Sequence, residues 1–169
     1  MKRAIVILAL LFAACDGDES PTAPNQPGSP NPPLGQTVPF TLVYADKYSG
    51  IRAPRHELIT QPARWQFVWD EIMSDGRSPR PPVPSVDFAR QQLILAALGE
   101  SPDACKDIEV ESVRLAGDIL QVSIKETRPP MSCSCPPVVV EPVDVIAIPR
   151  GTTKITFSRR SETVGAGCN

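Results

Sequence analysis

Short segments with alternating apolar and polar side chains, separated by tight turns, most constrain what this chain can fold into. The clearest pair lies at residues 107–115 and 119–126, on either side of a turn at residues 116–118 that contains a glycine. Alternation with a period of two across such a turn is typical of a β-hairpin. Each segment therefore has one apolar face, which we expect to lie against a core.

Further strands are predicted on both sides of this hairpin. Residues 93–98 are apolar at every position, which fits a central strand covered on both faces. Residues 38–45 predict a first strand with four large side chains on one face: Val38, Phe40, Leu42 and Tyr44. Three more segments are strand-like, at residues 51–59, 143–148 and 153–158, and Ile155 and Phe157 of the last are expected to point inward.

One amphipathic helix is predicted between Thr60 and Gly76. Its apolar residues recur at the spacing of a single helical stripe: Trp65, Val68, Trp69, Ile72 and Met73. Thr60 is expected to cap the start, Pro62 suits the first turn, and Gly76 follows the end. Because strands outnumber helices and follow one another through short turns, we expect an α+β fold. It would be a mostly antiparallel β-sheet or sandwich, with this one helix packed on it through Trp65 and Trp69.

The first 15 residues predict where the protein resides. Two basic residues precede an apolar run, residues 4–14, that ends directly at Cys15. This layout is typical of an export signal, and the run is too short for a membrane-spanning helix of about 20 residues. The sequence Phe12-Ala13-Ala14-Cys15 resembles the bacterial lipoprotein box, in which the cysteine is acylated and becomes the amino terminus. Cys15 is then expected to hold the protein in a lipid bilayer. The alternative is an ordinary secretory signal that ends beside a cysteine.

The domain organisation follows from this start. Residues 1–14 are interpreted as the signal peptide, residues 15–39 as the acylated cysteine and a proline-rich disordered tether, residues 40–160 as the folded domain, and residues 161–169 as a tail. The tether has too little apolar surface to offset the entropy lost on ordering.

The charge balance argues against one class of partner. The chain has 17 Lys and Arg and 19 Asp and Glu, and removal of Lys2 and Arg3 with the signal leaves 15 basic residues. A nucleic-acid-binding domain would instead show a basic stripe, so no nucleic-acid partner is expected.

Several motifs occur in a recognisable order along the predicted domain. They are the helix with Trp65 and Trp69, the sequence Val86-Asp87-Phe88, the strand ending Leu98-Gly99-Glu100, Gly117 in the hairpin turn, and the segment Val143–Arg150. Together, over residues 59–157, they resemble the carboxy-terminal domain of the protease complex subunit PrcB family. The resemblance implies a bacterial lipoprotein that helps to assemble or stabilise a cell-surface protease complex without cutting peptides itself. The chain departs from the family in two places. Residues 102–106 replace a glycine-glycine-tyrosine stretch, and a cysteine-containing insert occupies a later loop.

Four cysteines follow Cys15: Cys105, Cys133, Cys135 and Cys168. In an exported chain an even number predicts disulfides, and three pairings are possible. A bond between Cys133 and Cys135 would close a small, strained ring. Cys105 is therefore expected to pair with one of these two, and Cys168 with the other. Two alternatives use the same sulfurs: a structural zinc held by four thiolates, which lacks the usual paired spacing, and a redox-active Cys133/Cys135 pair.

No catalytic constellation is recognisable in the sequence. The single histidine, His56, has no partner motif, and no serine lies in a G-x-S-x-G sequence. Motifs of phosphate loops, EF-hands and zinc proteases are also missing. We therefore expect a protein that is not an enzyme and that uses no cofactor and no metal.

The function expected from the sequence is that of a membrane-anchored lipoprotein of the bacterial cell envelope, on the periplasmic side or the cell surface, whose domain binds protein. Two loops, residues 79–84 and 133–137, are the expected contact surface. The candidate contact residues in and beside them are Arg77, Arg80, Pro82 and Pro136. An envelope protease is the partner that the resemblance implies. Two alternatives stay open: a thiol-disulfide redox protein that uses Cys133 and Cys135, and a structural envelope lipoprotein with no discrete partner.

Overall fold

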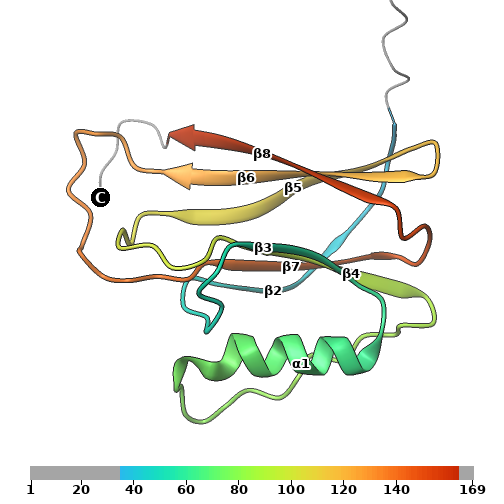
Figure 1. Ribbon diagram of the computed structural model, residues 1–169, viewed down its shortest axis with the longest axis horizontal. Helices are drawn as coiled ribbons and strands as arrows, with labels where there is room; N and C mark the ends of the chain where they lie inside the picture. The colour runs from blue at the N-terminus through green and yellow to red at the C-terminus, as the bar shows by residue number, and fades with distance from the viewer. Residues whose placement is uncertain (1–34, 164–169) are drawn as a thin grey trace, which may run out of the picture. The chain divides into compact units, whose positions relative to one another are not determined.

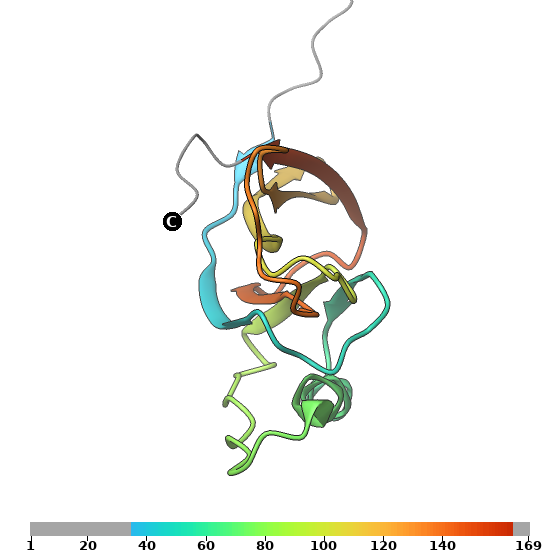
Figure 2. The same ribbon diagram turned by 90° about the vertical axis from the view of Figure 1, so that its left-hand side faces the viewer.

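The computed structural model describes residues 35–163, which fold in three layers (Figure 1). One four-stranded sheet, here called the outer sheet, has the strand order β1-β5-β6-β8. The other, the central sheet, has the order β2-β7-β4-β3. Helix α1 covers the face of the central sheet that points away from the outer sheet, as the end-on view of Figure 2 also shows. The predicted α+β sandwich with a packed amphipathic helix is confirmed.

The elements follow the chain in a simple order. They are β1 Gln36–Thr37, β2 Thr41–Asp46, β3 Arg55–Ile59, α1 Pro62–Ile72, a 3-10 turn η1 Met73–Asp75, β4 Gln91–Ala97, β5 Asp107–Ala116, β6 Ile119–Arg128, β7 Val143–Pro149 and β8 Ile155–Thr163. Paired strands are antiparallel, apart from β6 and β8, which are parallel. The predicted hairpin is β5–β6, and Gly117 in its turn has a φ of +63°, which favours glycine.

The centre of the protein is built on β4, which pairs with β3 on one side and β7 on the other. Its side chains alternate between two cores. Leu93 and Leu95 pack with helix α1, whereas Ile94 and Ala96 pack with the outer sheet. All four are fully buried, and burying a side chain of the size of leucine or isoleucine contributes about 1.5–3 kcal/mol. The prediction of a central strand covered on both faces is confirmed.

Helix α1 buries the predicted stripe, since Trp65, Val68, Trp69 and Ile72 are all inaccessible, as is Met73 in η1. The helix begins at Pro62, as expected, but the predicted cap at Thr60 is wrong. The cap position is Gln61, and no side chain caps the helix. Proline at the first position lacks one of the backbone N–H groups that the start of a helix leaves without a partner, and its fixed φ suits the first turn. The helical segment ends at Gly76, whose φ of +85° stops helical propagation.

The first predicted strand is wrong in its buried face. The chain leaves the outer sheet after β1 and crosses at Pro39 to the central sheet, where β2 begins. The pairing of β2 with β7 is irregular between Leu42 and Tyr44, so the alternation of faces breaks there. Leu42 is 65% exposed and Phe40 is 38% exposed, whereas Val43 and Tyr44 pack against the helix-side core.

The strands also exceed the predicted limits of the domain. Strand β1 lies within the range expected for the tether, and β8 continues to Thr163, within the expected tail. The predicted signal peptide, Cys15 and Cys168 lie outside the described residues.

Candidate functional site

The proline-rich loop at residues 79–84, one expected contact surface, is fastened to helix α1. The indole N–H of Trp65 donates to the carbonyl of Pro84 at 2.9 Å, and that of Trp69 donates to the carbonyl of Pro81 at 3.3 Å. Trp69 also meets the ring of Tyr44 edge-on, with centroids 4.9 Å apart. Both tryptophans are therefore core residues, as expected, and their polar atoms hold the loop against the domain.

The guanidinium of Arg77, expected to contact a partner, is engaged within the domain. It donates to Asp75 at 2.8 Å, to Asp46 at 2.7 Å and to the Tyr44 hydroxyl at 2.9 Å. Burial opposes ionisation of Asp46, but the hydrogen bonds from Arg77 and its neighbours outweigh it and hold the pKa of Asp46 below its usual value. Burial, followed by Asp46, raises the pKa of Tyr44 to about 12. Arg77 thus joins the end of the helical segment to β2, and its guanidinium is already engaged by these contacts.

Arg80 and Pro82 lie at the surface. Arg80 forms an ion pair with Asp70 of α1 at 2.6 Å, and about half of each side chain is exposed. Such a pair contributes roughly 0–1 kcal/mol, so it would yield readily to a partner. Pro82 and the neighbouring Val83 are exposed. This loop accordingly keeps a small accessible surface.

The second expected contact surface is fixed by a disulfide. We call residues 129–142, between β6 and β7, the braced loop. Cys135 of this loop is bonded to Cys105, which confirms that Cys105 pairs with one of the two neighbouring cysteines. Val140 and Ser101 exchange two backbone hydrogen bonds of 2.8 Å, and the Glu141 N–H donates to the carbonyl of Lys47 at 2.9 Å. The loop is therefore attached at its middle and at its end.

The other cysteine chemistry is limited by this bond. Cys133 is disulfide-bonded too, whereas Cys168, its expected partner, lies outside the described residues. Because the Cys135 sulfur is joined to Cys105, it forms no bond with Cys133. Ligand atoms of Asp103, Cys105 and Cys135 lie within 4.8 Å of one another, but zinc binds thiolates, and these two sulfurs are oxidised.

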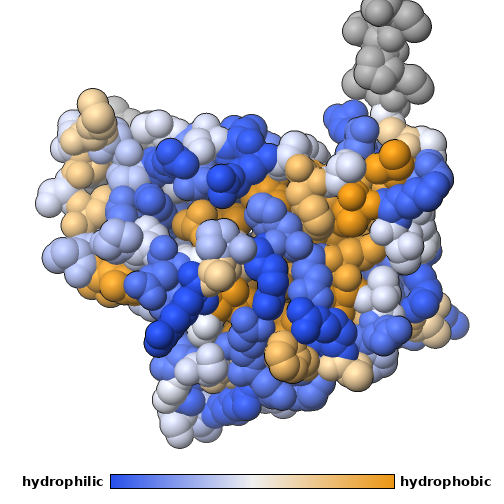
Figure 3. Space-filling view, in the orientation of Figure 1, coloured by the Kyte–Doolittle hydropathy of each residue, from blue (hydrophilic) through white to orange (hydrophobic). Residues whose placement is uncertain are grey.

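Apolar side chains of the braced loop face solvent. Met131 is fully exposed, and Val138 and Val139 are 44% and 47% exposed. Pro136 lies between them and is exposed as well. Figure 3 shows apolar side chains at the end of the domain where the loop after β6 lies in Figure 1. Clustered exposed apolar side chains of this kind mark interaction surfaces.

A groove of about 350 Å³ opens between the two sheets beside β2, and we call it the edge groove. Leu42 and Ala45 of strand β2 line it, together with Phe40, which directly precedes this strand. The facing residues include Asp107 and Val110 of β5 and Asp144 of β7.

Asp144 is the one residue of this groove that is both acidic and buried, with only 4% of it exposed. Its Oδ2 atom accepts a hydrogen bond of 2.6 Å from the Val110 N–H, and so links the central sheet to the outer sheet. Burial, aided by the charges of Glu109 and Asp107, raises its pKa to about 6. The sequence analysis missed this residue. Its only signal is an acid within a strand that is otherwise apolar on both faces.

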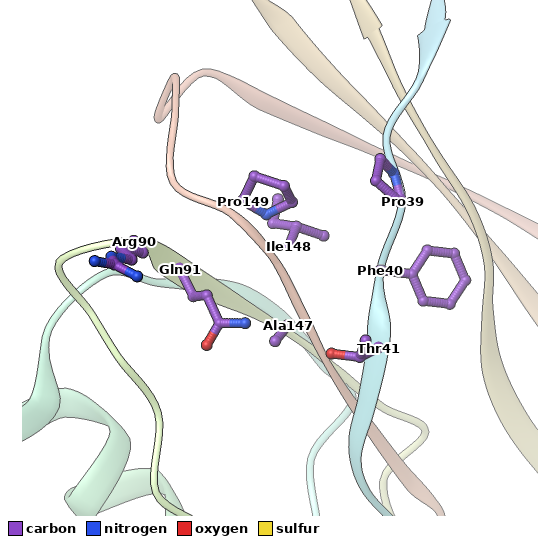
Figure 4. A pocket seen from close by; sticks show the side chains of 8 residues that line it. All are labelled: Pro39, Phe40, Thr41, Arg90, Gln91, Ala147, Ile148 and Pro149. Carbon is purple, nitrogen blue, oxygen red and sulfur yellow. The ribbon is translucent and has the colours of Figure 1, made fainter.

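A smaller hollow of about 260 Å³ lies at the end of the central sheet (Figure 4). Pro39, Ile148 and Pro149 line it together with the exposed Arg90. In Figure 4 the ring of Phe40 lies on the opposite side of the β2 chain from Ile148 and Pro149. The hollow combines one cation with apolar walls and offers no acid–base pair for catalysis.

His56, the single histidine of the chain, lies on β3 with its ring against Phe157, at a centroid distance of 5.4 Å. Burial, followed by the charge of Arg159, lowers its pKa. Its neighbours are thus an aromatic ring and a cation, which suits packing better than proton transfer from a nucleophile.

Within residues 35–163, no helix has both the length and the apolar character needed to cross a membrane. Comparison with family models, with curated proteins and with solved structures gives no match to this chain. The resemblance to the PrcB family therefore stays a prediction that rests on its motifs, and the function is argued from the geometry of the described residues.

Proposed function

We propose that this chain is a lipid-anchored, extracytoplasmic protein of the bacterial envelope that binds a partner protein through the braced loop. One observation carries the proposal: Met131, Val138 and Val139 are exposed on a loop that a disulfide and backbone hydrogen bonds hold in place. A surface that is already fixed loses little conformational entropy on binding, so burial of its apolar side chains contributes more fully to affinity.

The disulfide also supports an extracytoplasmic location. Disulfides form and persist in oxidising compartments and are rare in the cytosol. This agrees with the export signal predicted at residues 1–14. Acylation at Cys15 would add about 0.8 kcal/mol for each methylene buried in the bilayer, and two or more chains make a stable anchor.

The resemblance to the PrcB family supports a narrower form of the proposal. The partner would be a protein of an envelope protease complex, and this chain would be an accessory, non-catalytic subunit of it. The redox alternative is less favoured because Cys135 is bonded to Cys105 rather than to Cys133. The structural alternative, with no discrete partner, is separated by experiment.

The experiment compares two exposed valines on the two expected contact loops. A photo-crosslinking residue is placed at Val139 or, as the matched control, at Val83 in the full chain within native membranes. We expect a defined protein adduct from Val139 and none from Val83. Absence of an adduct at Val139 overturns the proposal and favours the structural alternative. An adduct from Val83 alone moves the contact surface to the proline-rich loop.

The anchor is tested separately by mass spectrometry of the protein purified from membranes. The expected amino terminus is Cys15 carrying a thioether-linked diacylglycerol. An intact residue 1 or an unmodified Cys15 would remove the anchor from the proposal and leave the binding surface to be judged on the crosslinking result.

A further inference from the structure

The exposed edges of the two sheets are protected to different degrees. Unpaired strand edges attract other strands, and proteins protect them with charges or with very short edge strands. In the outer sheet, β1 has two residues, and β8 carries Arg159, Arg160 and Glu162. In the central sheet, β3 carries Arg55 and Glu57, which form ion pairs with each other and with neighbouring residues. Three of the four edges are therefore protected.

Strand β2 forms the fourth edge and lacks this protection. Within the described residues it pairs with β7 alone, and its first five residues, from Thr41 to Ala45, carry no charge. Leu42 is 65% exposed, although leucine in a strand usually lies against a core. In Figure 2 no other element is drawn on the outer side of β2. An uncharged edge with a protruding leucine is suited to pairing with another strand.

A second unpaired strand segment faces the same groove. Strand β1 pairs only with Arg114 and Leu115 of β5, so the part of β5 from Asp107 to Ser112 has no neighbouring strand on that side among the described residues. One N–H in this part, that of Val110, is satisfied by the carboxylate of Asp144. A side chain thus occupies a place that a strand would otherwise take.

The charges around the edge groove are of one sign. Asp107, Glu109 and Asp144 contribute to its lining, and no basic residue does. Lys125 forms an ion pair with Glu109 at 2.5 Å, and Lys47 donates to the carbonyl of Ala104. One of the three carboxylates is therefore paired, while Asp144 has only backbone donors. An occupant with a basic side chain would complement this groove.

From these observations we infer that the edge groove binds an extended segment of a partner polypeptide, which adds a strand to β2. Its apolar side chains would lie against Phe40 and Leu42, and a lysine or arginine between them would point toward Asp144. In strand addition the backbone hydrogen bonds supply affinity, and the pockets for alternate side chains supply specificity. The inference depends neither on the braced loop nor on the anchor, because it rests on other residues.

The test uses the full mature chain and a fluorescent peptide of about nine residues, long enough to span β2, with alternating valine and threonine and a central lysine pair. Binding is followed by anisotropy at about pH 7.5, where carboxylates are ionised. Two control peptides are matched to it, one with glutamate in place of lysine and one N-methylated along one edge. We expect each to bind about tenfold more weakly or worse. Equal binding of the glutamate peptide or of the N-methylated peptide overturns the inference.

Variants of the chain locate the site. Leu42→Lys should weaken the lysine peptide about tenfold, and Asp144→Asn should weaken it while leaving a peptide with neutral side chains unaffected. Val83→Lys, in the proline-rich loop and not among the residues that line the edge groove, should change nothing. Amide hydrogen exchange should slow in β2 when the peptide binds, and protection confined to other strands would contradict strand addition. Sedimentation gives the remaining outcome: a dimer that Leu42→Lys dissociates would make a second copy the occupant and overturn the peptide inference.

Discussion

The two faces of the central sheet are covered by different layers, and they treat polar groups differently. On the face covered by helix α1, the indole N–H groups of Trp65 and Trp69 both reach loop carbonyls. On the face covered by the outer sheet, two polar side chains are buried. One is Gln92, whose Oε1 atom has no hydrogen-bond partner among the described residues, and the other is Asp144.

This difference indicates what each face contributes. The helix-covered face has close aromatic contacts and one partly buried cation, Arg55, whose charge is paired with Glu71 of α1 although its Nε and Nη2 atoms have no hydrogen-bond partner. The other face retains a buried carboxyl group whose ionised form is costly to desolvate. Natural proteins keep such destabilising groups mostly where function requires them. The sheet-covered side, where the edge groove lies, is therefore the better candidate for a functional surface.

The largest effect is expected on the helix-covered face. Trp69→Ala removes the contact with Tyr44 and the hydrogen bond to Pro81, and leaves a cavity. We expect a loss of about 3–5 kcal/mol in the free energy of unfolding, measured by denaturant titration. Phe67→Ala on the exposed side of the same helix is the control and should cost far less. Similar losses for both would show that this face is not a close-packed core.

Removal of the disulfide between Cys105 and Cys135 is expected to lower the free energy of unfolding by a similar or smaller amount. The double variant Cys105→Ala, Cys135→Ala opens a loop with a sequence separation of 30 residues. In the chain-entropy model this costs about 3 kcal/mol, which urea midpoints without reductant would reveal. Ser134→Ala, an exposed neighbour, serves as the control. An unchanged midpoint in the double variant would mean that the bond between Cys105 and Cys135 is not needed to hold the braced loop.

A gain in stability is expected from Asp144→Asn. The folded-state pKa of about 6 exceeds the ordinary value of 3.8, so the folded protein binds this proton more tightly than the unfolded chain. The contribution of this bound proton to the free energy of unfolding is fully present below about pH 4 and is lost as pH rises through about 6. Asparagine keeps an acceptor for the Val110 N–H and does not ionise. The variant should therefore be more stable than the parent by about 2–3 kcal/mol near pH 8 and similar to it near pH 4.

The control for this pH dependence is Asp118→Asn, in the exposed hairpin turn. Its stability should follow that of the parent at every pH above about 5, because surface ion pairs contribute little. If Asp144→Asn were less stable than the parent at high pH, the negative charge of Asp144 would be stabilising, and the contrast between the two faces would fail.

The smallest effect on stability is expected at the surface. Replacing Met131 and Val139 by serine removes exposed apolar groups and should alter the free energy of unfolding by less than about 0.5 kcal/mol. The same variant should lose the partner captured through the braced loop. A large loss of stability would show that these side chains pack within the domain, which would remove them from the proposed contact surface.

Much of the fold was predictable because local periodicity reports burial directly. The alternation at Leu120, Val122 and Ile124, the uniform run Leu93–Leu98 and the stripe through Trp65 and Trp69 each identified an element and its buried side chains. Periodicity failed at Phe40 and Leu42 because a register irregularity in β2 changes which face they occupy. That irregularity depends on how β2 pairs with β7, about 100 residues later in the chain, which no local pattern records.

By itself, the sequence determined the α+β class, the hairpin, the covered central strand and the helix stripe. It also indicated that Cys105 pairs with Cys133 or Cys135, because a bond between those two would close a strained ring. The tertiary structure alone decided that the partner of Cys105 is Cys135, that β8 runs parallel to β6, that Arg77 is engaged internally and that Asp144 lines a groove beside an unprotected edge. The reason is physical. Side-chain periodicity is a property of neighbours within one element, whereas these contacts join segments about 30 residues or more apart, and only chain packing brings them together.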